Sequence, residues 1–289
     1  MNMRSIDHLV MPVEGLAQGR AALQRLGFAV AADACHPFGT QNACVFLEDG
    51  AYLEPLAIGD PELYARSADA GNVFTDCDRH VRRIFPQGGL SAVVLATDDA
   101  FAEDAAYRAA GFSAGEVLEF SRKLALPTGR EVIASFRLAF AADDASPAFF
   151  MFACQRINML PRGIGALTRH ANGVSGLREI VLSADSLADE CHLLETVLAM
   201  KGRREGNSVI YGMRGCIVRV IGNPMSTASV TAKRGAMQDL RGHSVVFCVT
   251  NLAVTASVLA ANDVPFLRQH DRLVVANATG QDVLFAFEE

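Results

Sequence analysis

The sequence lacks most of the patterns that assign a chain to a functional class at first sight. It has no basic block and no acidic tail, and its net charge of -6 is spread along 289 residues, so no nucleic-acid footprint is visible. No apolar run reaches the roughly 18 residues that span a bilayer. The N-terminus leads into an apolar segment without a signal region. Phosphate-cradling glycine loops and GxSxG elbows are missing too. We therefore expect neither nucleic acid nor membrane as a partner.

The cysteines form no recognisable disulfide or metal-binding motif. The seven cysteines are scattered, odd in number and never in a CxxC pair, which argues against a disulfide framework. Most lie in apolar segments, as small core residues do. This usage predicts a reducing, cytoplasmic location. A composition of 51% hydrophobic and 20% charged residues is that of a globular protein with a generous core, and the length suggests about two domains.

One pattern recurs about four times along the chain. An apolar strand, a helix stopped by glycine and further strands form a βαβββ unit, first seen over residues 5–58. Similar units begin near residues 90, 177 and 243. Repeats at this spacing predict an α+β protein. The linkers at about 59–87 and 223–241 are long for compact connections, so we expect them to pack as lids or short helices.

Two polar residues interrupt the apolar strands of the first unit. His8 lies within Ile6–Val13, and Glu54 lies within Ala51–Ala57. Imidazole nitrogens and carboxylate oxygens are ligands for divalent Zn, Fe, Mn or Ni. A charged group in an apolar strand is costly without a partner, and a metal is one such partner. A metal-free polar pair in a binding pocket and satisfied core groups are the alternatives.

The first half of the chain resembles the glyoxalase-like domain family of the vicinal oxygen chelate superfamily. The resemblance covers about residues 5–175 and rests on short segments in matching order: Ile6-Asp7-His8-Leu9-Val10, Leu26-Gly27-Phe28, His36-Pro37-Phe38-Gly39-Thr40-Gln41-Asn42, Tyr52-Leu53-Glu54, Phe120-Ser121-Arg122, Phe149-Phe150-Met151-Phe152-Ala153-Cys154-Gln155 and His170-Ala171-Asn172-Gly173. The second half matches only in the order of its elements.

The resemblance implies that βαβββ units pair into half-open, U-shaped β-barrels with a divalent metal on the concave face. We expect two such barrels, in glyoxalase-like domains at residues 1–160 and 170–289. The sequence leaves open which units pair. The resemblance also suggests a homodimer.

The resemblance further implies metal ligands on the first and last strands of each paired unit, which here are His8 and Glu54. The second unit departs from that pattern, because Ala92 stands in the place of His8 and the segment 149–154 contains no acid. The third unit has Glu179 and Arg219 at these places; Glu179 is either a general base or the partner of Arg219 in a buried ion pair, and the arrangement favours the ion pair. In the fourth unit His243 is a candidate third ligand if the first and fourth units pair, and otherwise a strand-start residue.

Four further residues are candidates for substrate binding, each with a simpler structural alternative. His36 and Asn42 lie at a turn and a strand entry, Arg122 on a strand, and Arg156 where relatives often place histidine. The leading hypothesis is a metal-dependent lyase, isomerase or dioxygenase that acts on a small, oxygen-rich substrate, with His8 and Glu54 as catalytic residues. The alternative is a metal-free small-molecule binding or sequestering protein of the same fold.

Overall fold

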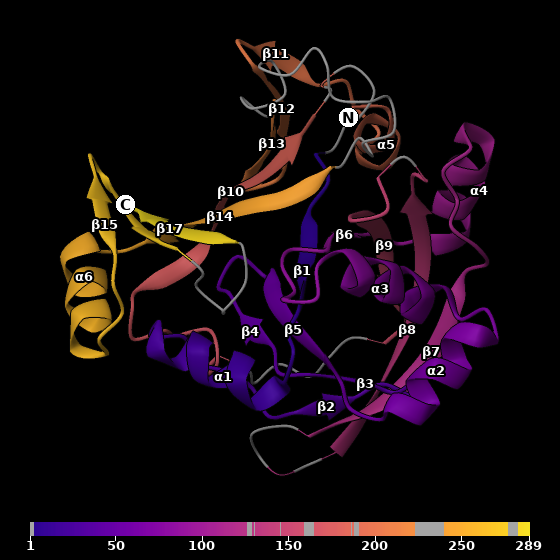
Figure 1. Ribbon diagram of the computed structural model, residues 1–289, viewed down its shortest axis with the longest axis horizontal. Coiled ribbons are helices and arrows are strands. Elements are labelled where there is room, and N and C mark those ends of the chain that lie inside the picture. Colours follow the sequence, from indigo (N-terminus) through magenta and orange to yellow (C-terminus); the bar gives the residue numbers. More distant parts are fainter. Residues whose placement is uncertain are drawn as a thin grey trace.

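The computed structural model describes residues 3–125, 129, 131–144, 146–158, 165–185, 187, 191–222, 240–276 and 283–289. These residues form two mixed β-sheets that lie next to each other, with helices against their faces (Figure 1). Among the described helices, none is long and apolar enough to cross a membrane. Most of the linker 223–241 lies outside the described residues, so the expectation for that segment stays a prediction.

The first sheet has nine strands in the order β2-β3-β5-β1-β6-β9-β8-β7, with β4 paired to β5. Its strands are β1 (Ile6–Pro12), β2 (Ala34–Cys35), β3 (Thr40–Asn42), β4 (Val45–Phe46), β5 (Tyr52–Ile58), β6 (Ala92–Ala96), β7 (Leu118–Ala125), β8 (Glu131–Ala142) and β9 (Phe150–Arg156). The short strands β3 and β4 both pair with β5. Because β2 and β7 come into contact although they stand at opposite ends of the strand order, this sheet curls into a nearly closed barrel.

The second sheet has eight strands in the order β11-β12-β13-β10-β14-β17-β16-β15. Its strands are β10 (Val174–Ala184), β11 (Arg203–Glu205), β12 (Ser208–Gly212), β13 (Ile217–Gly222), β14 (Arg241–Val249), β15 (Leu267–Gln269), β16 (Arg272–Val275) and β17 (Leu284–Glu288). In each sheet the first strands of two consecutive units run antiparallel side by side, β1 with β6 and β10 with β14. The predicted α+β class with four βαβββ units is confirmed, and the first unit pairs with the second.

Capping side chains precede some of the helices, and glycines follow others. They are α1 (Leu16–Arg25), α2 (Pro61–Asp69), α3 (Val73–Ile84), α4 (Ala100–Ala110), α5 (Cys191–Leu198) and α6 (Leu252–Ala261). The side chains of Asp60 and Asn72 accept hydrogen bonds from the first turns of α2 and α3. Gly27 and Gly111, which follow α1 and α4, have positive φ angles of 89° and 81°. Glycine tolerates this conformation, which ends both helices at the same point of the repeat.

Successive residues of the first sheet's central strands enter two different cores. Leu9 and Leu53 join a large core that also contains Phe247 and other residues of the second sheet. Val10 and Leu56 belong to a second core inside the curled sheet. This alternation follows from the two-residue period of a strand. Since the large core is common to both halves, the domain limits at residues 1–160 and 170–289 stay a prediction.

The first long linker covers the inside of the curled sheet. The predicted short helices are present there as α2 and α3, and α3 lies beside β1 and β6 (Figure 1). Val73, Phe74 and Val81 of α3 are buried in the inner core. The barrel interior is therefore filled by side chains of α3 as well as by those of the strands.

Candidate functional site

The site begins at an irregularity in β1. Ile6 pairs with Leu95 and His8 pairs with Val94, so Asp7 is an extra residue in this strand. Neighbouring residues of a regular strand point to opposite faces, whereas a β-bulge re-aims a side chain. Here the bulge brings Asp7 beside His8, with Oδ1 2.6 Å from Nδ1. Both residues are buried.

His8 lies between two carboxylates. Its Nε2 is 3.5 Å from Glu54 Oε2, while its Nδ1 faces Asp7. Burial alone would lower the pKa of His8, but the hydrogen bonds and charges of Asp7 and Glu54 outweigh burial and raise it. Burial alone would likewise raise the pKa of Glu54, yet His8 holds it at about 2. His8 and Glu54 thus lie close together, and carboxylates flank both ring nitrogens of His8.

Glu54 is also the centre of a second set of contacts. Asn42 Nδ2 donates a hydrogen bond to Glu54 Oε1, and Arg122 Nη1 donates one to Asn42 Oδ1 over 3.2 Å. His36 Nε2 lies 3.8 Å from Glu54 Oε1. The structure thus brings together His8, Glu54, His36, Asn42 and Arg122, which come from β1, β5, the β2–β3 turn, β3 and β7.

His36 is the neutral imidazole of the cluster. Its Nδ1 is 2.8 Å from Thr40 Oγ1, and its ring stacks on Phe38 with centroids 5.0 Å apart. Burial, joined by the charge of Arg122, lowers the pKa of His36 to about 3. A neutral ring nitrogen directed at Glu54 is available to accept or donate a hydrogen bond.

Arg156 does not join the Glu54 side of the cluster. Its Nη2 lies 2.8 Å from Asp7 Oδ2, and its guanidinium carbon lies 5.7 Å from the ring centroid of Tyr52. Tyr52 in turn stacks on His8, with ring centroids 4.4 Å apart. Arg156 therefore holds the far carboxylate of the Asp7–His8–Glu54 chain, with one third of its side chain exposed. Sequence reasoning missed Asp7; the available signal was a second charged residue next to His8 in an apolar strand.

A small cavity of about 20 Å³ opens beside these groups. His8, His36, Glu54 and Arg122 supply its polar lining, and most of the remainder is aromatic: Tyr52, Phe74, Phe120, Phe136 and Phe152, with Leu138 and Cys154. This volume accommodates about one water molecule. A larger ligand requires some of the surrounding rings to move.

The second unit supplies no polar partner at the equivalent positions. In the strand register Val10 lies opposite Glu54, and Val94 lies opposite Phe152, so Phe152 corresponds to Glu54. Ala92 holds the place of His8, as the sequence indicates. Ala92 and Phe152 both belong to the inner apolar core, and the ring of Phe152 meets that of His8 edge-on at 5.4 Å.

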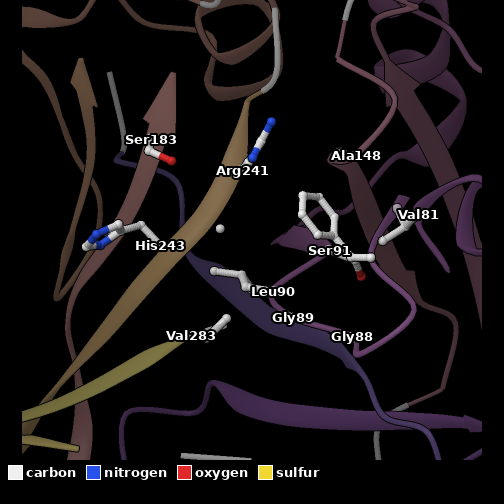
Figure 2. Close-up of a pocket in the computed structure, with 12 residues that line it drawn as sticks. Val81, Gly88, Gly89, Leu90, Ser91, Ala148, Ser183, Arg241, His243 and Val283 are labelled. Carbon is white, nitrogen blue, oxygen red and sulfur yellow. The ribbon is translucent and has the colours of Figure 1, made fainter. Parts of the chain in front are cut away.

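The structure does not bring His243 to this cluster. His243 lies on β14 of the second sheet and lines a separate cavity of about 210 Å³. Figure 2 shows that cavity, where Leu90 and Ser91 of the first half approach Ser183 and Arg241 of the second. The condition for a shared ligand set was pairing of the first and fourth units, and the first unit pairs with the second instead.

The equivalent positions of the third unit hold the expected ion pair. Arg219 Nε donates to Glu179 Oε1, and Arg272 Nη2 lies 3.9 Å from Glu179 Oε2. These charges satisfy one another at the surface of the second sheet. We therefore assign them a structural role.

The donors at the first site match a metal in type but not in arrangement. Two imidazoles and a carboxylate are ligands that Fe²⁺ and Mn²⁺ accept. However, His8 is already in contact with Asp7 and Glu54, Glu54 accepts a hydrogen bond from Asn42, and Arg122 adds a positive charge to the lining. Within the described part of the chain, no group of three or more His, Cys, Asp or Glu side chains is placed to hold a metal ion.

The sequence matches the family described as "Glyoxalase-like domain" over residues 6–198, which is more than half of the chain. The chain belongs to the glyoxalase-like domain family. No protein of curated function matches the sequence.

Several solved structures share the fold of this glyoxalase-like protein. A hypothetical protein from Staphylococcus aureus has a TM-score of 0.67 and 12% identity, covering 99% of both chains. A mutant of 4-hydroxymandelate synthase from Streptomyces coelicolor has a TM-score of 0.64 and 12% identity, covering 99% of this chain and 92% of that one. The Mn(II)-bound glyoxalase from Novosphingobium aromaticivorans has a TM-score of 0.55 and 11% identity, covering 99% and 83%. At these identities the likeness establishes the fold alone.

Proposed function

We propose that this glyoxalase-like protein binds a small, oxygen-rich organic molecule inside the first curled sheet, through charge and hydrogen bonds rather than through a resident metal ion. The observation that carries the proposal is the Asp7–His8–Glu54 chain, in which His8 has a carboxylate 2.6 Å from one ring nitrogen and another 3.5 Å from the other. Asp7 pairs with His8 and Arg156, and Glu54 pairs with His8, so each buried carboxylate has a partner without a metal.

The cavity around this chain is suited to a polar ligand with a flat or apolar body. Neutral His36 and the donors of Arg122 stand on one side, and aromatic rings form most of the remaining lining. A few placed polar groups within an apolar, aromatic wall are typical of small-molecule sites. With the pKa of Glu54 at about 2 and that of His36 at about 3, neither group is an effective base near neutral pH, so the lining is suited to binding rather than to proton transfer.

A metal-dependent lyase, isomerase or dioxygenase is the second candidate. One observation favours it: Asp7 holds the Nδ1 of His8, as carboxylates commonly orient metal-binding histidines, while Nε2 points toward Glu54. His36 would then complete a set of two imidazoles and one carboxylate. Two structural neighbours, a Mn(II)-bound glyoxalase and a mutant of 4-hydroxymandelate synthase, agree with this alternative.

Metal content and metal-induced stabilisation distinguish the two. Protein purified without chelator should contain substoichiometric Zn, Fe, Mn and Ni by elemental analysis, and none of these metals should raise its melting temperature. Stoichiometric metal, or a thermal shift that His8→Ala removes, would establish the metal-dependent candidate, since a ligand that binds only the folded state stabilises it by mass action. Asp33→Ala, at an exposed ion pair with Arg20, is the matched control.

A further inference from the structure

Arg122 differs from Arg156 and Arg82 in forming no ion pair within 4 Å among the described residues. Arg156 and Arg82 each have a carboxylate oxygen within 3 Å. Arg122 makes one hydrogen bond, to the neutral amide of Asn42, and its buried Nε has no partner within the described residues. Its guanidinium carbon lies 5.9 Å from the ring centroid of Phe136. Burying a guanidinium among aromatic rings costs free energy when one of its N–H donors makes no hydrogen bond, unless a ligand accepts that hydrogen bond.

The carboxylates near the cavity contact other partners. Asp7 lies beside His8 and pairs with Arg156, and Glu54 lies 3.5 Å from His8 Nε2 and accepts a hydrogen bond from Asn42. Lys123, the next residue on β7, pairs with Glu131 over 3.0 Å at the exposed surface. Arg122, which lines the cavity, therefore stands without an ion-pair partner within 4 Å among the described residues.

We infer that Arg122 binds the carboxylate of an aromatic organic acid, with the aromatic body of the ligand against Phe120 and Phe136. This inference rests on the proposed function and names the ligand class of the same site. A guanidinium presents two parallel N–H donors that match a carboxylate, so the unpartnered Nε and an Nη fit one such group. The rings of Phe120 and Phe136 stack with centroids 5.2 Å apart and form the flat side of the lining.

The position of Arg122 also gives the ligand a route inward. Because β7 is the last strand in the order of the first sheet, Arg122 and Phe120 lie on a strand that pairs with β8 alone. A ligand larger than the 20 Å³ cavity would need β7 to move, and such a movement breaks no second strand ladder although it loosens the contact of β7 with β2.

Calorimetric titration of the full chain with benzoate and with its neutral analogue benzamide tests the inference. Wild type should bind benzoate at least about tenfold more tightly than benzamide, because a charge-assisted pair is worth that much. Arg122→Gln should lose this preference, Arg122→Lys should keep part of it, and Lys123→Gln should behave as wild type. Circular dichroism and melting temperature verify that each variant is folded.

Several outcomes separate this inference from the proposed function. Equal binding of benzoate by wild type and Arg122→Gln, no preference over benzamide, or no binding of benzoate would overturn the role of Arg122. If EDTA abolishes the binding of benzoate, and Arg122→Gln weakens that binding when EDTA is absent, the metal-free function would be overturned. Arg122 would then remain the residue that binds the carboxylate.

Discussion

Replacement of Asp7 by asparagine tests whether the buried charge chain holds the site together. Asp7 contacts His8 over 2.6 Å and Arg156 over 2.8 Å, and its side chain is 5% exposed. Removing one partner from a buried ion pair typically costs about 3–5 kcal/mol, because the remaining charge stays buried without compensation. The exposed pair of Arg20 and Asp33 should contribute at most about 1 kcal/mol. We expect Asp7→Asn to lower the free energy of unfolding several times more than Asp33→Asn does.

The pH dependence of this cost follows from the two pKa shifts. The raised pKa of His8 stabilises the fold fully below its unfolded value of 6.5, and this contribution is lost as the pH rises through the folded pKa. Burial raises the pKa of Asp7, but the pairing with His8 and Arg156 outweighs burial and lowers it. The contribution of Asp7 to stability is therefore complete above pH 3.8 and is lost as the pH falls through the folded pKa. The cost of Asp7→Asn should therefore be greatest between pH 3.8 and 6.5.

Urea unfolding of wild type, Asp7→Asn, Asp33→Asn and Asp7→Asn/Arg156→Gln at several pH values measures these effects. The double variant should recover part of the loss, because it removes the uncompensated guanidinium together with its partner. An NMR titration should also show a lower pKa for His8 in Asp7→Asn. A cost equal to that of Asp33→Asn, with an unchanged His8 pKa, would refute the charge-chain reasoning.

Three further predictions concern neighbouring residues. Because the fold lowers the pKa of His36, its contribution to stability is fully present above the unfolded value of 6.5 and is lost as the pH falls. Acidification toward pH 3 should therefore lower the free energy of unfolding of wild type relative to His36→Asn by up to about 1.4 kcal/mol per pH unit, measured by urea unfolding. Parallel plots of unfolding free energy against pH for the two proteins would contradict this. Phe74→Ala should cost about 3–5 kcal/mol by the same assay, whereas Phe101→Ala, at a half-exposed ring, should cost little. Ala92→His with Phe152→Glu should give a thermal shift with Zn²⁺ or Mn²⁺ that wild type lacks, and its absence would argue against these positions as the missing ligand places.

The repeated units, their helices and the polar residues His8 and Glu54 could all be predicted from the sequence. These features are encoded locally, because a two-residue or helical period and a glycine stop act within one element. The common face of His8 and Glu54 follows from the same logic, since each interrupts an apolar strand at the position its repeat assigns. Locally encoded patterns therefore determined the fold class and the centre of the site.

Tertiary structure alone decided what surrounds that centre. The bulge at Asp7 depends on the pairing of β1 with β6, and a regular strand would have pointed Asp7 away from His8. Arg122 reaches Asn42 across 80 residues of sequence, and His243 is separated from the site because β14 joins the other sheet. Such contacts depend on strand register and on which units pair, and no local period encodes either. For that reason the sequence determined the two central residues, and the packing of the sheets determined the charges around them.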